Sequence, residues 1–295
     1  MRFQYLQPAS LQEAFSLLAQ HSPQAKVMAG GTDLLVAMKM QKLSPSVVIG
    51  LSQIPEMAGV AYDSSSKAIR IGALATHQEV SSSSAILEKF SHLAGAASLV
   101  GSRQVRNLGT TVGNICNASP SAETAPALLT VEAVVNIAGP TGTRQVAIGD
   151  FFTGPGRTVV GGDEIVTEVT IPDPEPNSAG AYIKLSPRRA MDLAVVGVAV
   201  FLSVRNGVCD KARVALGAVA PTPIRVPDAE AILSGEAVND NLLEQAAQAA
   251  MKACRPISDV RSSAEYRREM VGVLVKRAIR EALGRSRNQE GGRLQ

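Results

Sequence analysis

The stretch VMAGGTDLL, Val27–Leu35, places two adjacent glycines between a short apolar run and a segment with the composition of a helix. The preceding residues, AKVMA, predict a strand, and TDLLVAMKM predicts a helix after the turn. Glycine adopts positive φ without strain and has no side chain, so the backbone N–H groups around Gly30 and Gly31 can converge on an anion. The start of the following helix would add partial positive charge, and Thr32 a hydroxyl.

Such a turn suits a pyrophosphate, but two common phosphate-binding motifs are absent from it. The spacing G-x-G-x-x-G of dinucleotide-binding folds does not occur there, and no G-K-[ST] follows as in a P-loop. Taken alone, the two glycines also fit an ordinary structural turn, and that interpretation stays open at this point.

A second segment, NLGTTVGNICNASPSAET at residues 107–124, favours a ligand site over an ordinary turn. It embeds apolar Val112, Ile115 and Cys116 among glycines, asparagines and hydroxyl side chains. Surface loops rarely carry apolar residues in this way. Neutral donors next to small apolar groups suit a large ligand of mixed polarity, such as a dinucleotide, better than a bare phosphate.

Composition and charge exclude several other functions. With 295 residues, 45% hydrophobic and 19% charged, the chain reads as globular, and no apolar run approaches the roughly 18 residues of a membrane span. A net charge of +3 and 3% aromatic residues do not indicate a nucleic-acid-binding protein. The N-terminus shows no signal-peptide core, so we expect a cytoplasmic protein.

Cysteine and histidine are too sparse and too scattered for a metal centre. Cys116, Cys209 and Cys254 cannot supply an all-cysteine iron–sulfur cluster, and the three histidines lack metal-ligand spacing. We therefore assign no metal ligand to this chain. Of the histidines, His77 in ATHQEV is the one to watch.

The pattern of elements predicts an α+β chain with two domains and a tail. Residues 1–175 form the first domain, a small βαβ-type part followed by a part with a mixed or antiparallel sheet. A Pro-rich linker in IPDPEPNSAG leads to a smaller α+β domain, residues 176–285, with an antiparallel hairpin turned at residues 205–210 and two or three helices. Residues 84–100 predict one helix, residues 101–124 a turn-rich segment, and residues 286–295 a flexible tail.

MAGGTDLL and RNLGTTVGNICNASPSAET closely resemble the two FAD-binding motifs of the flavoprotein subunit of molybdenum hydroxylases. This family includes the medium subunit of aerobic carbon monoxide dehydrogenase and the FAD subunit of xanthine dehydrogenase. The resemblance continues through FFTGPGRTVVGGDEIVTEVTIP, YIKLSPRRAMDLAVVGVAV, ALGAVAPTPIR and YRREMVGVLVKRAI, so it covers essentially the whole chain. The segments FFTGPGRT and APTPIR place the xanthine dehydrogenase-like branch nearest.

The resemblance implies which residues bind FAD. In the family, the glycine turn wraps the pyrophosphate, the second motif supports pyrophosphate, ribityl chain and flavin, and a lysine lies near the pyrimidine edge of the ring. Asp192 resembles part of a mobile loop beside the flavin. Carried over to this sequence, the implied cofactor-binding residues are Val27, Met28, Ala29, Gly30, Gly31, Thr32, Asp33, Leu34, Thr110, Thr111, Gly113, Asn114, Ser119, Glu123, Ile165 and Lys184.

Two departures from the family pattern G-T-(I/L)-G-G-N fall in the second motif. Val112 stands where the first glycine is usual, and Thr111 replaces the aliphatic residue. If the glycine has positive φ in the family, a valine there is strained by about 1–3 kcal/mol. If the glycine only permits close approach, the valine pushes the cofactor outward.

The resemblance further implies an electron-transfer subunit without a catalytic residue of its own. Electrons from a molybdopterin centre on a large subunit would pass through [2Fe–2S] clusters on a second subunit to FAD here, and on to NAD⁺, a quinone or oxygen. The complex would be a dimer of heterotrimers. Two alternatives remain: a stand-alone FAD oxidoreductase, and a scaffold subunit that has lost its flavin.

Overall fold

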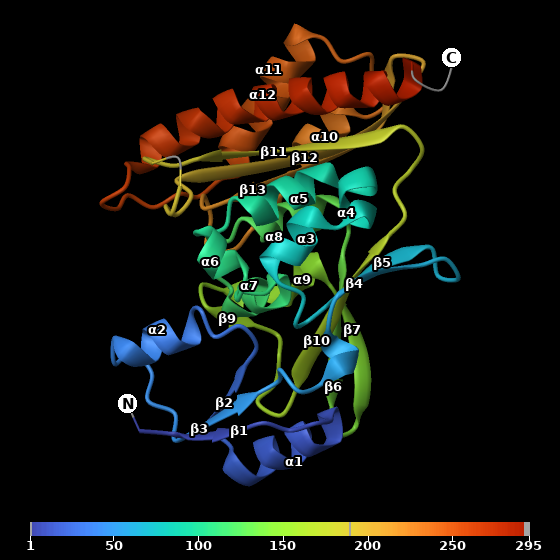
Figure 1. Cartoon of the computed structure of the whole chain (residues 1–295). Coiled ribbons are helices and arrows are strands. Elements are labelled where there is room, and N and C mark those ends of the chain that lie inside the picture. The colour runs from blue at the N-terminus through green and yellow to red at the C-terminus, as the bar shows by residue number, and fades with distance from the viewer. Residues whose placement is uncertain (1, 189, 292–295) are drawn as a thin grey trace.

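The computed structural model describes residues 2–188 and 190–291, which form three layered parts stacked along one axis (Figure 1). A small sheet with α1 and α2 lies at one end, a five-stranded sheet with a group of short helices in the middle, and a four-stranded sheet under three helices at the other end. The predicted α+β class, with a two-part first section and an antiparallel C-terminal sheet, is confirmed.

The N-terminal sheet has three parallel strands in the order β1-β3-β2: β1 Gln4–Leu6, β3 Val47–Gly50 and β2 Ala25–Met28. Helix α1 (Leu11–His21) leads from β1 to β2, and α2 (Leu34–Lys39) leads from β2 to β3, as βαβ connections require. Ser10 caps α1 by accepting from the Glu13 N–H, and the Glu13 carboxylate accepts from Ala9 N–H. The glycine turn therefore follows the carboxyl end of β2.

The middle part is built on an antiparallel sheet in the order β4-β5-β10-β6-β7. Its strands are β4 Val60–Asp63, β5 Ala68–Gly72, β10 Ile165–Pro172, β6 Val134–Gly139 and β7 Gly142–Ala147. Short helices lie beside it: α3 His77–Ser82, α4 Ser84–Lys89, α5 Ser91–Ser98, α6 Arg103–Arg106, α7 Thr111–Asn117, α8 Thr124–Thr130 and α9 Ile148–Phe151. The remaining short elements are the 3₁₀ turn Pro55–Met57, β8 Phe152–Gly154 and β9 Arg157–Thr158.

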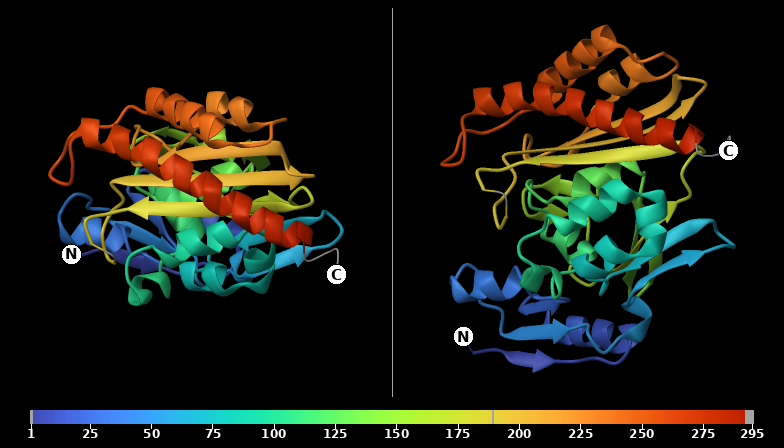
Figure 2. Two further views of the ribbon diagram at one scale, coloured as in Figure 1. Left: turned by 90° about the horizontal axis from the view of Figure 1, so that it is seen from above. Right: turned by 45° about the horizontal axis from the view of Figure 1, so that its top comes forward.

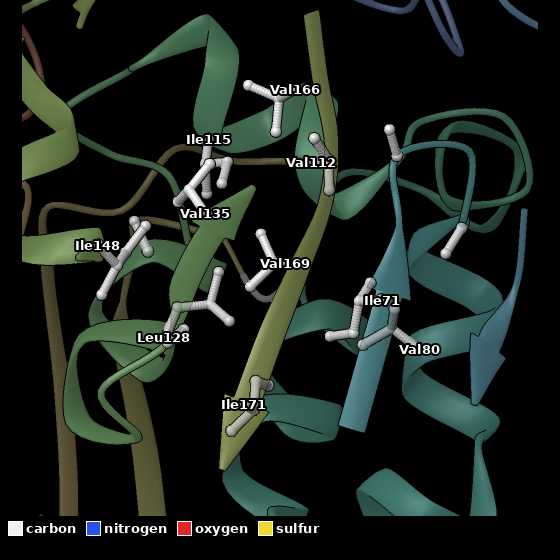
Figure 3. Close-up of a cluster of buried hydrophobic side chains, with 14 of the residues drawn as sticks. Ile71, Val80, Val112, Ile115, Leu128, Val135, Ile148, Val166, Val169 and Ile171 are labelled. Atoms are coloured by element: carbon white, nitrogen blue, oxygen red, sulfur yellow. The ribbon is translucent and has the colours of Figure 1, made fainter. Parts of the chain in front are cut away.

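One hydrophobic core joins this sheet to its helices. Figure 3 shows Val169 and Ile171 of β10 pointing toward the same cluster as Ile115 of α7 and Leu128 of α8. All four side chains are fully buried, which makes α7 and α8 integral parts of the core rather than surface loops.

The C-terminal sheet is antiparallel in the order β11-β12-β13-β14, with β11 Ser178–Leu185, β12 Val196–Arg205, β13 Val208–Gly217 and β14 Ile224–Arg225. Strands β12 and β13 form the predicted hairpin. Helices α10 (Pro227–Leu233), α11 (Asp240–Ala253) and α12 (Ala264–Gly291) cover one face, and α12 crosses the strands at an angle (Figure 2).

Alternation along β12 explains why this sheet is buried on both sides. Ala199 and Phe201 belong to the core shared with α5 and α8, whereas Val198 and Val200 belong to the core under α10–α12. Successive strand residues point to opposite faces, so a continuous apolar run serves both cores.

Three local features differ from the sequence-based expectation. The helix predicted for residues 84–100 is interrupted at Phe90, whose backbone leaves the helical region and whose ring packs 5.8 Å from that of Phe201. The segment 101–124, predicted to be turn-rich, contains the helices α6 and α7. Helix α12 continues past residue 285 to Gly291, because Ser286 is buried and its hydroxyl donates to the Asn177 carbonyl. Residues 292–295 of the predicted tail lie outside the described residues.

Candidate functional site

A cavity of about 740 Å³ lies where the three parts of the chain meet. Its walls come from the glycine turn after β2, the start of α7, the first residues of β10 and residues 191–193 before β12. All the sequence-predicted site residues line it except Thr111 and Lys184. The size falls within the range of small-molecule sites, roughly 300–1,000 Å³.

The two glycines of the turn serve different purposes. Gly31 has φ +70°, a conformation that side chains rarely adopt. At Gly30 a Cβ would lie 1.8 Å from the carbonyl oxygen of Leu108. The first glycine is therefore needed because the turn packs directly against the backbone of the second motif.

This turn also offers unused hydrogen-bond donors to the cavity. Among the described residues, no protein acceptor receives the backbone N–H groups of residues 29–33, and these residues all line the cavity. A run of free backbone donors on a cavity wall suits an acceptor-rich ligand such as an anion.

The second motif contributes the start of α7, which begins with a side-chain cap. Thr110 accepts from the Gly113 N–H at 2.9 Å, and Asn114 on the next turn lines the cavity. The Thr124 hydroxyl donates to Asn114 Oδ1 at 2.7 Å, which leaves the Asn114 amino group as the donor available to a ligand.

Val112, the departure from the family pattern, lies in the first turn of α7 with helical backbone angles. It is absent from the positive-φ residues found in the described chain, so backbone strain at this position is ruled out. Its side chain is 2% exposed and packs in the core near Val166 (Figure 3), although it also borders the cavity.

Glu123 lines the cavity, and Lys184 lies behind it. The Lys184 ammonium donates to Glu123 Oε1 at 2.7 Å, to the Asp192 carbonyl at 2.6 Å and to the Leu99 carbonyl at 3.3 Å. Both side chains are 7% exposed. Burial raises the pKa of Glu123 and outweighs the opposing effect of Lys184. Lys184 therefore does not line the cavity itself. It acts on the cavity by holding the Glu123 carboxylate and the loop at residues 191–193.

Asp33 and His77 are among the further titratable groups that line the cavity. Burial raises the pKa of Asp33, in the turn. His77, the first residue of α3, was not among the predicted site residues. Its ring is 2% exposed, and burial together with the nearby Arg106 charge lowers its pKa to about 4. The sequence signal for His77 was only its place in ATHQEV after a strand.

The fold and the site define the class of protein: an α+β chain that binds a large, acceptor-rich ligand in a cavity between its parts. Comparison with known proteins is more specific. Residues 1–174 match the FAD binding domain in molybdopterin dehydrogenase, and residues 181–282 match the CO dehydrogenase flavoprotein C-terminal domain.

Full-length relatives agree with both family matches. The medium chain of carbon monoxide dehydrogenase from Hydrogenophaga pseudoflava is 35% identical, over 96% of this chain and 98% of its own. The xanthine dehydrogenase FAD-binding subunit of Escherichia coli O157:H7 is 34% identical, over 99% and 98%. A solved structure of the Hydrogenophaga enzyme, lacking the Mo-pyranopterin moiety of its cofactor, superimposes with a TM-score of 0.93 over 97% of this chain and 98% of that chain.

The chain therefore belongs to the FAD-binding subunits of the molybdenum hydroxylase family. Nearly equal identities to the two relatives do not separate the branches, so the nearer kinship to xanthine dehydrogenase stays a prediction.

The residues present fit the FAD of this family. Gly30 leaves no room for a side chain, the turn supplies free N–H donors, and the walls mix polar groups with apolar ones such as Val27 and Ile165. Such a mixture suits a ligand with a charged diphosphate and an apolar ring system. Which of the lining residues contact the cofactor stays a prediction.

Proposed function

We propose that this chain is the electron-transfer subunit of a molybdenum-containing hydroxylase or dehydrogenase, receiving electrons from [2Fe–2S] clusters of one partner and delivering them to an acceptor such as NAD⁺, a quinone or oxygen. The partners are an iron–sulfur subunit and a large molybdopterin subunit, in a dimer of heterotrimers in the cytoplasm. The substrate is chosen on the large subunit.

The observation that carries the proposal is the joint wall formed by the glycine turn and the second motif in a chain of this family. The Gly30–Leu108 contact brings both motifs to one cavity. FAD, when bound, supplies chemistry in which electrons move singly or in pairs, as a link between one-electron clusters and a two-electron acceptor requires.

In this proposal, the one-electron donors, the [2Fe–2S] clusters, are held by a partner subunit. Cys116, Cys209 and Cys254 are all free thiols, and burial raises the pKa of Cys116 to about 12 and of Cys209 to about 11. Across the described ranges, no three His, Cys, Asp or Glu side chains gather as metal ligands. No described helix is both long and apolar enough to cross a membrane.

This chain's own residues would bind the cofactor, orient it and shield it from water. The turn at residues 29–33 would hold the diphosphate, and Asn114 on α7, fixed by Thr124, would orient the ligand. Lys184 places a positive charge behind Glu123 and anchors the 191–193 loop at the cavity edge. No residue is assigned a proton-transfer role.

Rapid kinetics on the assembled complex tests the proposal. The complex is reduced anaerobically with substrate, and cluster and flavin absorbances are followed before and after addition of NAD⁺, a water-soluble quinone or oxygen. The proposal predicts that clusters are reduced before the flavin and that one acceptor reoxidises the flavin within a turnover. Flavin reduction in the isolated chain by a substrate of its own would support a stand-alone oxidoreductase, and turnover without any flavin would support a scaffold.

A further inference from the structure

His77 lies beside the glycine turn, on the cavity wall. The point where a Cβ on Gly109 would stand is 3.1 Å from Thr32 Oγ1 and 3.5 Å from His77 Cδ2. The imidazole and the Thr32 hydroxyl therefore flank the same bare stretch of backbone. Because Cδ2 is bonded to Nε2, the ring edge nearest Gly109 carries a nitrogen. Thr32, on the other side of this contact, belongs to the turn whose N–H groups have no protein acceptor among the described residues.

Thr111 determines which ring nitrogen carries the proton. Its Oγ1 lies 3.3 Å from His77 Nδ1, both side chains are buried, and no other hydrogen-bond partner of this hydroxyl exists among the described residues. If the hydroxyl donates to Nδ1, both groups are satisfied. The reverse arrangement leaves the hydroxyl hydrogen without an acceptor, which is unfavourable inside a protein. Nε2 is therefore the protonated nitrogen.

The Nε2–H has no acceptor in the part of the chain that the structure describes. Nε2 has no partner among the described residues, yet it is not one of the fully buried unpaired atoms, so it keeps some exposed surface. His77 lines the cavity, and this ring edge is therefore open to a ligand. Burial and the Arg106 charge keep the ring neutral at neutral pH. A neutral N–H donor beside a row of neutral backbone donors is suited to an oxyanion that bridges several donors.

We propose that His77 binds the diphosphate of the dinucleotide, donating its Nε2–H alongside the backbone N–H groups of the glycine turn, with Thr111 holding the required tautomer. The inference rests on the proposed function, because FAD supplies the diphosphate. It adds to the site a residue that neither FAD motif contains.

The test measures the affinity of three probes for the full chain stripped of flavin. FAD carries the flavin, the diphosphate and the adenosine; ADP carries the diphosphate and adenosine without the flavin; riboflavin carries the flavin without the diphosphate. For His77→Leu we expect FAD and ADP to bind about ten- to one-hundred-fold more weakly, the usual effect of losing a hydrogen bond to a charged group, with riboflavin unchanged. His77→Gln, whose amide nitrogen can reach the place of Nε2, restores most of the ADP affinity.

His92 offers a matched control, since it is equally buried, hydrogen-bonded to Thr130 and outside the cavity lining. His92→Gln should leave the affinity for all three probes unchanged in folded protein. If His77→Leu fails to fold, ¹⁵N NMR of the wild-type histidines replaces it. Only three histidines are present, and the His77 Nε2–H resonance should shift on addition of ADP.

Either of two affinity results would overturn the inference alone: ADP affinity unchanged in His77→Leu, or ADP and riboflavin weakened equally, which indicates a structural role. An unchanged His77 resonance with saturating ADP would do the same. Failure of the wild-type chain to bind FAD, alone or in its complex, would instead contradict the proposed function.

Discussion

Gly30 and Leu108 meet backbone to backbone, so closely that a methyl group on Gly30 would stand 1.8 Å from the Leu108 carbonyl oxygen and 2.6 Å from its carbon. This contact joins the turn after β2 of the N-terminal sheet to the segment between α6 and α7 in the middle part of the chain. The cavity is shaped by it, since both segments line its walls.

Gly30→Ala should therefore destabilise the chain and open the cavity. Backbone atoms cannot yield as a flexible side chain does, so we expect a loss of at least about 3 kcal/mol in the free energy of unfolding, together with loss of bound flavin. Urea denaturation and the flavin content after purification measure the two effects.

Gly95→Ala is the matched control for this substitution. Gly95 lies within α5 with open space around its Cβ position, and alanine favours helix, so stability should be unchanged or rise by about 0.5–1 kcal/mol. A Gly30→Ala chain as stable as Gly95→Ala would contradict the account of the contact.

Val112→Gly tests whether the valine hinders cofactor binding. The side chain is buried in the core, so its removal should lower the free energy of unfolding by about 2–3 kcal/mol. The affinity for FAD, measured by fluorescence titration below the unfolding midpoint, should change by less than about threefold, a small free-energy difference. A much tighter complex in the glycine variant would show that Val112 pushes the cofactor outward.

Lys184→Met should lower the free energy of unfolding in a pH-dependent way, because it leaves the Glu123 carboxyl without its ion-pair partner. Without the ammonium, burial, with the nearby Asp33 charge, raises the folded-state pKa of this carboxyl further above the unfolded value. A group whose pKa is higher in the folded than in the unfolded state stabilises the fold at pH values below its unfolded-state pKa. This contribution is lost as the pH rises through the folded-state pKa. The deficit of the variant should therefore be small near pH 4 and reach about 3–5 kcal/mol near pH 7, the usual result of orphaning a buried charge.

The double variant Glu123→Gln, Lys184→Met serves as the control. With neither charge present, the unfolding free energy should no longer fall between pH 4 and pH 7 relative to wild type. A double variant that keeps the slope of Lys184→Met would assign the pH dependence to another group.

Arg213 should set part of the acid sensitivity of the chain. Its guanidinium bonds Glu132 and Glu175, lowers the pKa of Glu132, and lowers that of Glu175 to about 2. Depressed folded-state pKa values contribute stability above the unfolded pKa that is lost as pH falls toward 2.

In Arg213→Met we therefore expect lower stability at pH 7 and a shallower loss of stability from pH 5 to pH 3, measured by urea midpoints. Arg205→Met is a suitable comparison, because the Arg205–Asp210 pair is largely exposed and such pairs contribute about 0–1 kcal/mol. Equal slopes in both variants would show that Arg213 does not determine the acid response.

Much of the architecture could be predicted from sequence because local signals and packing agree. The strand, glycine turn and helix around Gly30 were predicted from periodicity and backbone freedom, and the β12–β13 hairpin from two apolar runs around a turn. The helix α7 was missed because threonine, glycine and asparagine favour turns. Tertiary contacts overrode that tendency, with the Thr110 cap and the burial of Val112 and Ile115.

In the site, too, local features could be predicted from the sequence and features that depend on tertiary contacts could not. Spacing within each motif was visible in the sequence, but the place of Lys184 behind Glu123 and the place of His77 beside the turn depend on contacts between distant segments. The Gly30–Leu108 approach likewise has no local signature. Roles of the lining residues toward FAD stay predictions until binding is measured.

The most direct test of the central claim is the visible absorption spectrum of the purified chain, recorded alone, after addition of FAD, and in the assembled complex. The account predicts flavin bands that remain with the protein through gel filtration at one FAD per chain, released on denaturation because the cofactor is held without a covalent bond. A protein that stays colourless with added FAD, both alone and in the complete complex, would contradict it.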